Sequence, residues 1–174
     1  MKQFLTCIIV VIAILVFTAK PCYAQESDSS AVIKTQEVSE NFDYRAENLR
    51  LFFQKYNSPL APYSEDFVKY ADAYGIDYRM VPAITGVEST FGKQIPSNSY
   101  NAYGWANGDY KFESWEDSIS VVTQTLRSKY IDKGAPSISK IARRYAPPST
   151  TWGTKVKYFV GKIDTLPLDF DIVI

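Results

Sequence analysis

Residues 86–92 read Gly86-Val87-Glu88-Ser89-Thr90-Phe91-Gly92 and close an apolar run that begins near Met80. On a helical wheel of about 100° per residue, Glu88 falls within about 40° of Ile84, inside the apolar arc. A carboxylate that is buried without a partner costs several kcal/mol. The segment therefore predicts a buried helix whose single acid has either a partner or a function.

Spacing alone leaves two interpretations of Glu88 open. In the first, Glu88 is a structural acid paired with Arg143 or Arg144, since structural ion pairs also perturb pKa values. In the second, apolar neighbours and the negative end of the helix dipole, with Gly92 just past the helix, raise the pKa of Glu88 above about 4.3. A carboxyl group that stays protonated near neutral pH can donate its proton to a glycosidic oxygen.

The segment after Glu88 favours the second interpretation. Asn107-Gly108 separates residues 103–106 from residues 109–112, and Asn-Gly is the strongest two-residue signal for a β-hairpin. Aromatic rings with amides between them suit a sugar, which stacks through its C–H face and hydrogen-bonds through its hydroxyls. The residues of this kind are Asn98, Ser99, Tyr100, Asn101, Tyr103, Trp105, Asn107 and Tyr110. For any one of them, a place in the hairpin core or in a turn is the simpler explanation.

The remaining pattern predicts one mainly α domain over residues 43–174, with a core over 63–163 and the small hairpin inserted after the helix that holds Glu88. Caps, stops and helical spacing mark the expected helices, with N-caps expected at Ser64, Ser114, Ser137 and Thr151 and a stop at Gly75. These are Asp43–Lys55, Ser64 to about Tyr74, Asp77 to Phe91, Ser114 to about Tyr130, Ile138–Tyr145 and Trp152 to about Ile163. The tail 166–174 is apolar and strand-like, and nothing obvious pairs with it.

The first 24 residues have the pattern of a secretory signal peptide. Lys2 precedes an apolar run from Phe4 to Ala19, and Cys22 and Ala24 are small residues at a cleavage site. Residues 25–42 are polar and acidic, which predicts a disordered tether. We therefore expect export to a periplasm, a cell envelope or the medium, with membrane attachment only if the signal is not cleaved.

Composition excludes several classes of function. The chain has no histidine, and its two cysteines, Cys7 and Cys22, lie in the signal region. Catalysis by Ser-His-Asp or Cys-His groups and zinc ligation by His or Cys therefore lack their parts, and we expect no metal and no cofactor. Loss of Lys2 and Lys20 with the signal leaves 17 basic and 19 acidic side chains without a basic block, which argues against a nucleic-acid partner.

Five short motifs together resemble a known family. They are Glu88-Ser89-x-Phe91-Gly92, Asn101-Ala102-Tyr103-Gly104, Phe112-x-Ser114-x-Glu116-Asp117-Ser118-Ile119, Ile141-Ala142-Arg143-Arg144-Tyr145-Ala146-Pro147 and Trp152-x-x-Lys155-Val156. In this order they look like the bacterial glucosaminidases of glycoside hydrolase family 73, the mannosyl-glycoprotein endo-β-N-acetylglucosaminidase-like domain. The resemblance covers roughly residues 63–163.

The resemblance implies a lysozyme-like fold that cuts peptidoglycan glycan strands at N-acetylglucosamine. Glu88 matches the general acid/base of the family, and Tyr145 matches a tyrosine across the cleft. Asp109 is the best-placed residue for a second carboxylate, with Glu113 behind it. The expected substrate-binding residues are Ser89, Phe91, Asn98, Asn101, Tyr103, Gly104 and Trp105.

Two other functions remain open. Lytic transglycosylases share the Glu-Ser start but usually continue with Gly-Leu-Met-Gln where this chain has Gly104-Trp105-Ala106-Asn107, and they release 1,6-anhydro products. A catalytically silent lysozyme-like module that binds glycan or an envelope protein is the alternative from another class. If no second acid reaches the site, the acetamido group of the substrate can act as internal nucleophile, with Glu88 first as acid and then as base.

Overall fold

The computed structural model describes residues 43–164, which fall in one compact unit. This part of the chain contains six α-helices and no β-strand, so the predicted mainly α fold is confirmed. The predictions for residues 1–24, 25–42 and the tail 166–174 lie outside the described residues.

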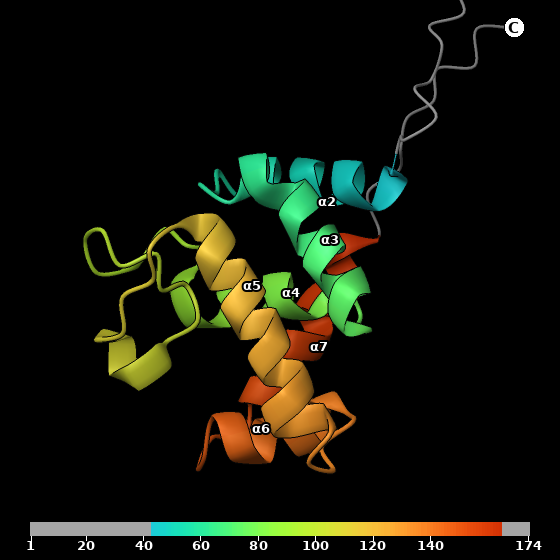
Figure 1. The fold of residues 1–174 in the computed structure, drawn as a ribbon, viewed down its shortest axis with the longest axis vertical. Coiled ribbons are helices and arrows are strands. Elements are labelled where there is room, and N and C mark those ends of the chain that lie inside the picture. The colour runs from blue at the N-terminus through green and yellow to red at the C-terminus, as the bar shows by residue number, and fades with distance from the viewer. Residues whose placement is uncertain (1–42, 165–174) are drawn as a thin grey trace, which may run out of the picture. The chain divides into compact units, whose positions relative to one another are not determined.

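The helices match most of the expected ranges. In chain order they are α2 (Tyr44–Lys55), the 3₁₀ turn η1 (Ala61–Tyr63), α3 (Ser64–Tyr74), α4 (Met80–Ser89), the 3₁₀ turn η2 (Trp105–Gly108), α5 (Trp115–Thr125), the π-helix η3 (Leu126–Ile131), α6 (Ile138–Tyr145) and α7 (Trp152–Ile163). Helix α4 packs against α7, and α3 packs against α5 (Figure 1). Between α4 and α5, the one element of regular structure is the short turn η2.

Local sequence explains several helix ends. The side chain of Asp43 caps α2 by accepting a hydrogen bond from the backbone N–H of Arg45 at 2.9 Å. Gly75 ends α3 at φ +61°, a conformation that glycine adopts without strain. Ser114 and Ser137 cap α5 and α6 through their hydroxyl groups.

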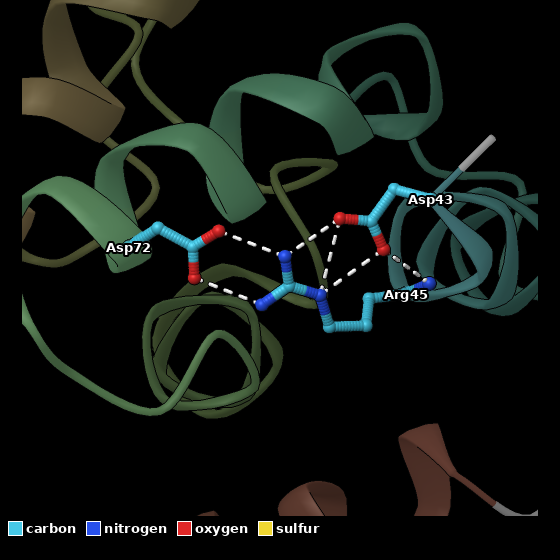
Figure 2. Close-up of polar contacts among 3 residues, drawn as sticks. All are labelled: Asp43, Arg45 and Asp72. Carbon is cyan, nitrogen blue, oxygen red and sulfur yellow. Dashed lines mark hydrogen bonds and ion pairs between the residues drawn. The ribbon is translucent and has the colours of Figure 1, made fainter. Parts of the chain in front are cut away.

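A guanidinium held by two carboxylates joins the start of α2 to α3. Arg45 donates to Asp43 and, through two nitrogens, to both oxygens of Asp72 at 2.8 Å (Figure 2). The two N–H bonds to Asp72 run in parallel, which is the favourable geometry for an arginine and a carboxylate. Because the Asp72 carboxylate is more than half exposed, the stabilisation of this contact is on the order of 1 kcal/mol or less.

Phe91 is at the centre of the aromatic core. Its ring lies 5.3 Å from Phe52, 4.5 Å from Tyr56 and 5.0 Å from Phe159, which brings α2 and α7 to the end of α4. The Phe91 side chain is 1% exposed, so its expected role as a substrate contact is not supported by its position in the fold. Burial of a phenylalanine contributes about 1.5–3 kcal/mol to stability.

Helix α4 ends at Ser89, two residues before the predicted end at Phe91. Thr90, Phe91 and Gly92 all have positive φ, at +53°, +59° and +77°, so the chain makes a left-handed turn directly after Ser89. Left-handed backbone costs a non-glycine residue roughly 1–2 kcal/mol. Hydrogen bonds offset this cost: the N–H of Phe91 donates to the Thr85 carbonyl, and the hydroxyl of Ser58 donates to the Phe91 carbonyl.

The expected β-hairpin over residues 103–112 is not seen. Gly104, Ala106 and Asn107 have left-handed backbones, and the segment forms the turn η2 instead. The cause is the side chain of buried Asn101, whose amide nitrogen donates to the carbonyls of Trp105 (2.9 Å) and Tyr110 (3.0 Å). These two bonds occupy carbonyls on both sides of Asn107-Gly108. The segment therefore folds as the turn η2 and not as two strands paired by backbone hydrogen bonds.

Helix α5 continues into a π-helix that the sequence does not predict. Six residues, Leu126–Ile131, follow Thr125 with the wider π spacing. Such segments are uncommon and often occur near functional sites. The π-helix carries Tyr130, whose ring lies 5.9 Å from that of Tyr145.

Among residues 43–164, no helix is both long enough and apolar enough to cross a bilayer.

Candidate active site

Glu88 is in the last turn of α4 and is partly buried. Burial raises the pKa of its carboxyl group above the ordinary value, because water solvates the charged form better than protein does. A hydrogen bond from Trp152 acts in the opposite direction and lowers the pKa, with the smaller effect. The expected upward shift is therefore present.

The partner of Glu88 is an indole. Nε1 of Trp152 donates a hydrogen bond to Oε1 of Glu88 at 2.5 Å, and Trp152 is 4% exposed at the start of α7. Arg143 and Arg144 are exposed, and no ion pair within residues 43–164 joins either of them to Glu88. This geometry argues against the structural acid–arginine pair.

Tyr145 fixes the orientation of this indole. The ring of Tyr145 stacks on Trp152 with centroids 4.9 Å apart and planes 26° apart. Its hydroxyl donates to the backbone carbonyl of Tyr103 at 2.7 Å. Burial raises the pKa of Tyr145 well above 10, and the nearby charge of Glu88 adds to this shift, so Tyr145 stays protonated at neutral pH. Tyr145 is thus a hydrogen-bond donor here.

Gly104 faces the second oxygen of Glu88. A Cβ atom built on Gly104 lies 2.8 Å from Oε2 of Glu88, closer than real Cβ contacts allow. Gly104 also has φ +71°, which favours glycine. Glycine therefore suits the backbone conformation at this position, and a larger residue would displace the Glu88 carboxylate from its present place.

A hollow of about 410 Å³ opens beside Gly104. Its lining residues come from the turn η2, from the end of α5, from the π-helix and from α6. They are Gly104, Trp105, Ala106, Asn107, Thr125, Tyr130 and Tyr145. Three aromatic rings next to backbone and amide groups can contact a sugar ring, and a sugar unit fits the volume.

Several predicted binding residues hold the site together from inside the fold. The hydroxyl of Ser89 is buried and lies 3.0 Å from the Thr85 carbonyl and 2.9 Å from the Ala102 carbonyl, so it connects α4 to the loop. Asn101 is 3% exposed and binds four backbone groups of that loop. Tyr103 is fully buried against Phe112 at 6.0 Å.

The other predicted residues lie at the surface. Asn98 is exposed with φ +55°, and Trp105 is partly buried against Tyr110 and Phe112. Asp109 is exposed at the end of η2, and no contact joins its carboxylate to Glu88. A catalytic role for Asp109 stays a prediction.

The structure thus brings together Glu88, Gly104, Tyr145 and the Tyr103 carbonyl from the predicted set. It adds Trp152 and Tyr130, which the predicted set lacked. Trp152 had one signal, its place in the last of the five motifs. No sequence signal pointed to Tyr130, because its position near Tyr145 depends on the π-helix, which the sequence pattern does not predict.

Among the described residues, no group of three or more His, Cys, Asp or Glu side chains could hold a metal ion. No family model matches the chain, and no curated protein matches it.

Proposed function

We propose that this protein is an exported peptidoglycan hydrolase of the β-N-acetylglucosaminidase type, with Glu88 as general acid/base. The observation that carries the proposal is the pairing of Glu88 with an indole, not a guanidinium, next to an aromatic-lined hollow. A partly buried carboxyl group with a raised pKa is suited to protonate a leaving glycosidic oxygen. A mainly α fold is also compatible with the lysozyme-like architecture that the motifs suggest.

The chemistry can proceed with one carboxyl group from the protein. Glu88 gives its proton to the glycosidic oxygen as the C1–O bond breaks, and the acetamido oxygen of the substrate bonds to C1. Glu88, now ionised, then takes a proton from water, whose oxygen bonds to C1 and displaces the acetamido oxygen. This route fits the surroundings of Glu88, because no carboxylate among residues 43–164 contributes to its pKa shift.

A lytic transglycosylase is the second proposal, and the same observation supports it. When a hydroxyl of the glycan itself adds to C1 in place of water, a single carboxyl group can serve as acid and base. The product is then a 1,6-anhydro sugar, lighter by one water than a reducing end. Mass spectrometry of the released fragments separates the two reactions.

The test is digestion of purified sacculi by the wild-type protein and by Glu88→Gln. We expect wild type to release soluble muropeptides and Glu88→Gln to release almost none. Glu65→Gln is the matched control, because Glu65 is an exposed acid on α3. Binding of sacculi without release of fragments by wild type would favour the silent glycan-binding module, and undiminished release by Glu88→Gln would refute the role of Glu88.

A further inference from the structure

The two carboxylate oxygens of Glu88 have different surroundings. Oε1 accepts the hydrogen bond from Nε1 of Trp152 at 2.5 Å. Oε2 lies next to the position of a Gly104 Cβ, and no hydrogen bond from residues 43–164 reaches it. Gly104 also lines the hollow of about 410 Å³. One oxygen is therefore occupied by the protein, and the other lies beside Gly104, which itself lines the hollow.

An indole N–H is a donor only. The carbonyl oxygen of a neutral carboxyl group is a stronger acceptor than its hydroxyl oxygen, so the bond from the indole favours the form in which Oε1 is the carbonyl oxygen and Oε2 carries the proton. Oε2 of the partly buried Glu88 has no protein partner among residues 43–164, so water or a ligand can bind it. Both statements place the acidic proton on the oxygen that lies beside Gly104.

We propose that Trp152 and Gly104 assign separate tasks to the oxygens of Glu88: Trp152 holds Oε1 as an acceptor, and Gly104 keeps Oε2 open to carry and deliver the proton. This inference rests on the proposed function of Glu88 as a general acid. It makes Trp152 a positioning residue and Gly104 a determinant of access.

The neighbouring side chains support this assignment. Tyr145 stacks on the Trp152 ring and binds the carbonyl of Tyr103, the residue before Gly104, so one tyrosine fixes both the indole and the glycine. Of the charged or titratable groups on the packed elements, Tyr145 on α6 is the one that interacts with Glu88 electrostatically. Lys155, one turn along α7, is exposed and lines a separate hollow with Val87 and Tyr158.

The first test follows the protonation of Glu88 without any substrate. Protein labelled with ¹³C at the glutamate carboxyl carbons is titrated by NMR, and Glu88→Gln identifies the signal of Glu88. We expect the pKa of Glu88 to rise in Trp152→Phe, because phenylalanine keeps the ring stack on Tyr145 but removes the donor that stabilises the ionised form. An unchanged titration in a folded Trp152→Phe protein would overturn the assignment of Oε1.

The second test measures turnover of sacculi against pH. Because the acid must be protonated, activity falls as pH rises through the pKa of Glu88. We expect Trp152→Phe to move this alkaline limb to higher pH and to lower the plateau roughly 10- to 100-fold, the effect of losing one hydrogen bond to a charged group. If Trp152→Phe lowers the maximal activity but leaves the alkaline limb of the pH profile at the same pH, Trp152 has a structural role alone and the proposed assignment of Oε1 is wrong.

The third test compares Gly104→Ala with Gly134→Ala. Both glycines have positive φ, +71° and +87°, so the backbone strain is similar, but a Cβ on Gly134 meets nothing within 4 Å. We expect Gly104→Ala to lose more than about tenfold in activity and Gly134→Ala to retain it. Equal activities would overturn the role of Gly104.

These tests separate the inference from the proposed function. If wild type releases no fragments from sacculi, the proposed function fails, while the NMR titration of Trp152→Phe still decides whether the indole controls Glu88. If wild type is active and the titration does not move, the function stands and the inference fails.

Discussion

Trp152 and Glu88 are 64 residues apart in the chain, yet the indole nitrogen of one lies 2.5 Å from a carboxylate oxygen of the other. The contact joins the first residue of α7 to the last turn of α4. The carboxyl group therefore reaches its final environment only when α7 has docked on α4.

Glu88→Gln is expected to reduce the release of muropeptides at least about 100-fold, because a positioned general acid/base contributes about 10²–10⁴-fold. The glutamine carbonyl can still accept the hydrogen bond of Trp152, so the fold is retained. Circular dichroism checks the fold, and fragment release from sacculi checks activity. Activity within twofold of wild type in a folded variant would contradict this prediction.

The pH dependence of stability offers a second prediction about Glu88. Since its pKa is raised in the folded protein, the folded state binds more protons than the unfolded state between the ordinary pKa of about 4.3 and the folded value. The contribution of Glu88 to stability therefore falls as pH rises through this window. Thermal melts at several pH values check this, and the difference in Tm between wild type and Glu88→Gln should grow from about pH 4 upward.

Tyr145→Phe is expected to destabilise the protein by about 1–2 kcal/mol, because the Tyr103 carbonyl loses its donor at 2.7 Å. Activity should fall too, because Gly104, which lies beside the Glu88 carboxylate, directly follows Tyr103 and would lose its fixed position. Tyr130→Phe is the matched control: Tyr130 lines the same hollow, and its hydroxyl has no hydrogen bond with the described residues. Urea denaturation measures both variants, and equal losses of stability would contradict the prediction.

Asn101→Ala is expected to destabilise the protein by about 2–4 kcal/mol, because four bonds to the backbone of residues 103–110 are lost. Amide hydrogen exchange should show lost protection in that loop. Asn98→Gly is the control, since Asn98 is exposed and glycine suits its φ of +55°. An Asn101→Ala protein as stable as this control would show that the amide bonds contribute nothing.

Asp109→Asn tests whether the site needs a second acid. On the substrate-assisted route we expect activity to fall by less than about tenfold, well below the effect expected of a true acid/base partner. Fragment release from sacculi measures it beside Glu88→Gln. A loss as large as that of Glu88→Gln would show that Asp109 acts in catalysis and that the route through the acetamido group is wrong.

Signals that act within a few residues predicted the helices well. Asp43, Gly75, Ser114 and Ser137 mark helix ends in the structure as they do in the sequence, because a cap bonds the backbone one turn away. Ser64 and Thr151 were expected to cap helices in the same way, but neither side chain makes a cap hydrogen bond.

Features that depend on distant residues were not predictable. Asn107-Gly108 is a strong local hairpin signal, but the amide of Asn101 binds carbonyls on both sides of it and fixes a different turn. The same holds for the site. The position of Glu88 on the apolar arc was read correctly from the helical wheel, whereas its partner on α7 depends on how two helices pack.

The left-handed turn of Thr90, Phe91 and Gly92 has a consequence for protein engineering. Two non-glycine residues keep this backbone because the Phe91 ring fills a pocket made by α2 and α7 and because Ser58 binds the Phe91 carbonyl. A graft of residues 86–92 onto another helical scaffold would relax into an ordinary helix end and misplace the carboxyl group. A transplant must therefore carry the receiving pocket along with the heptapeptide.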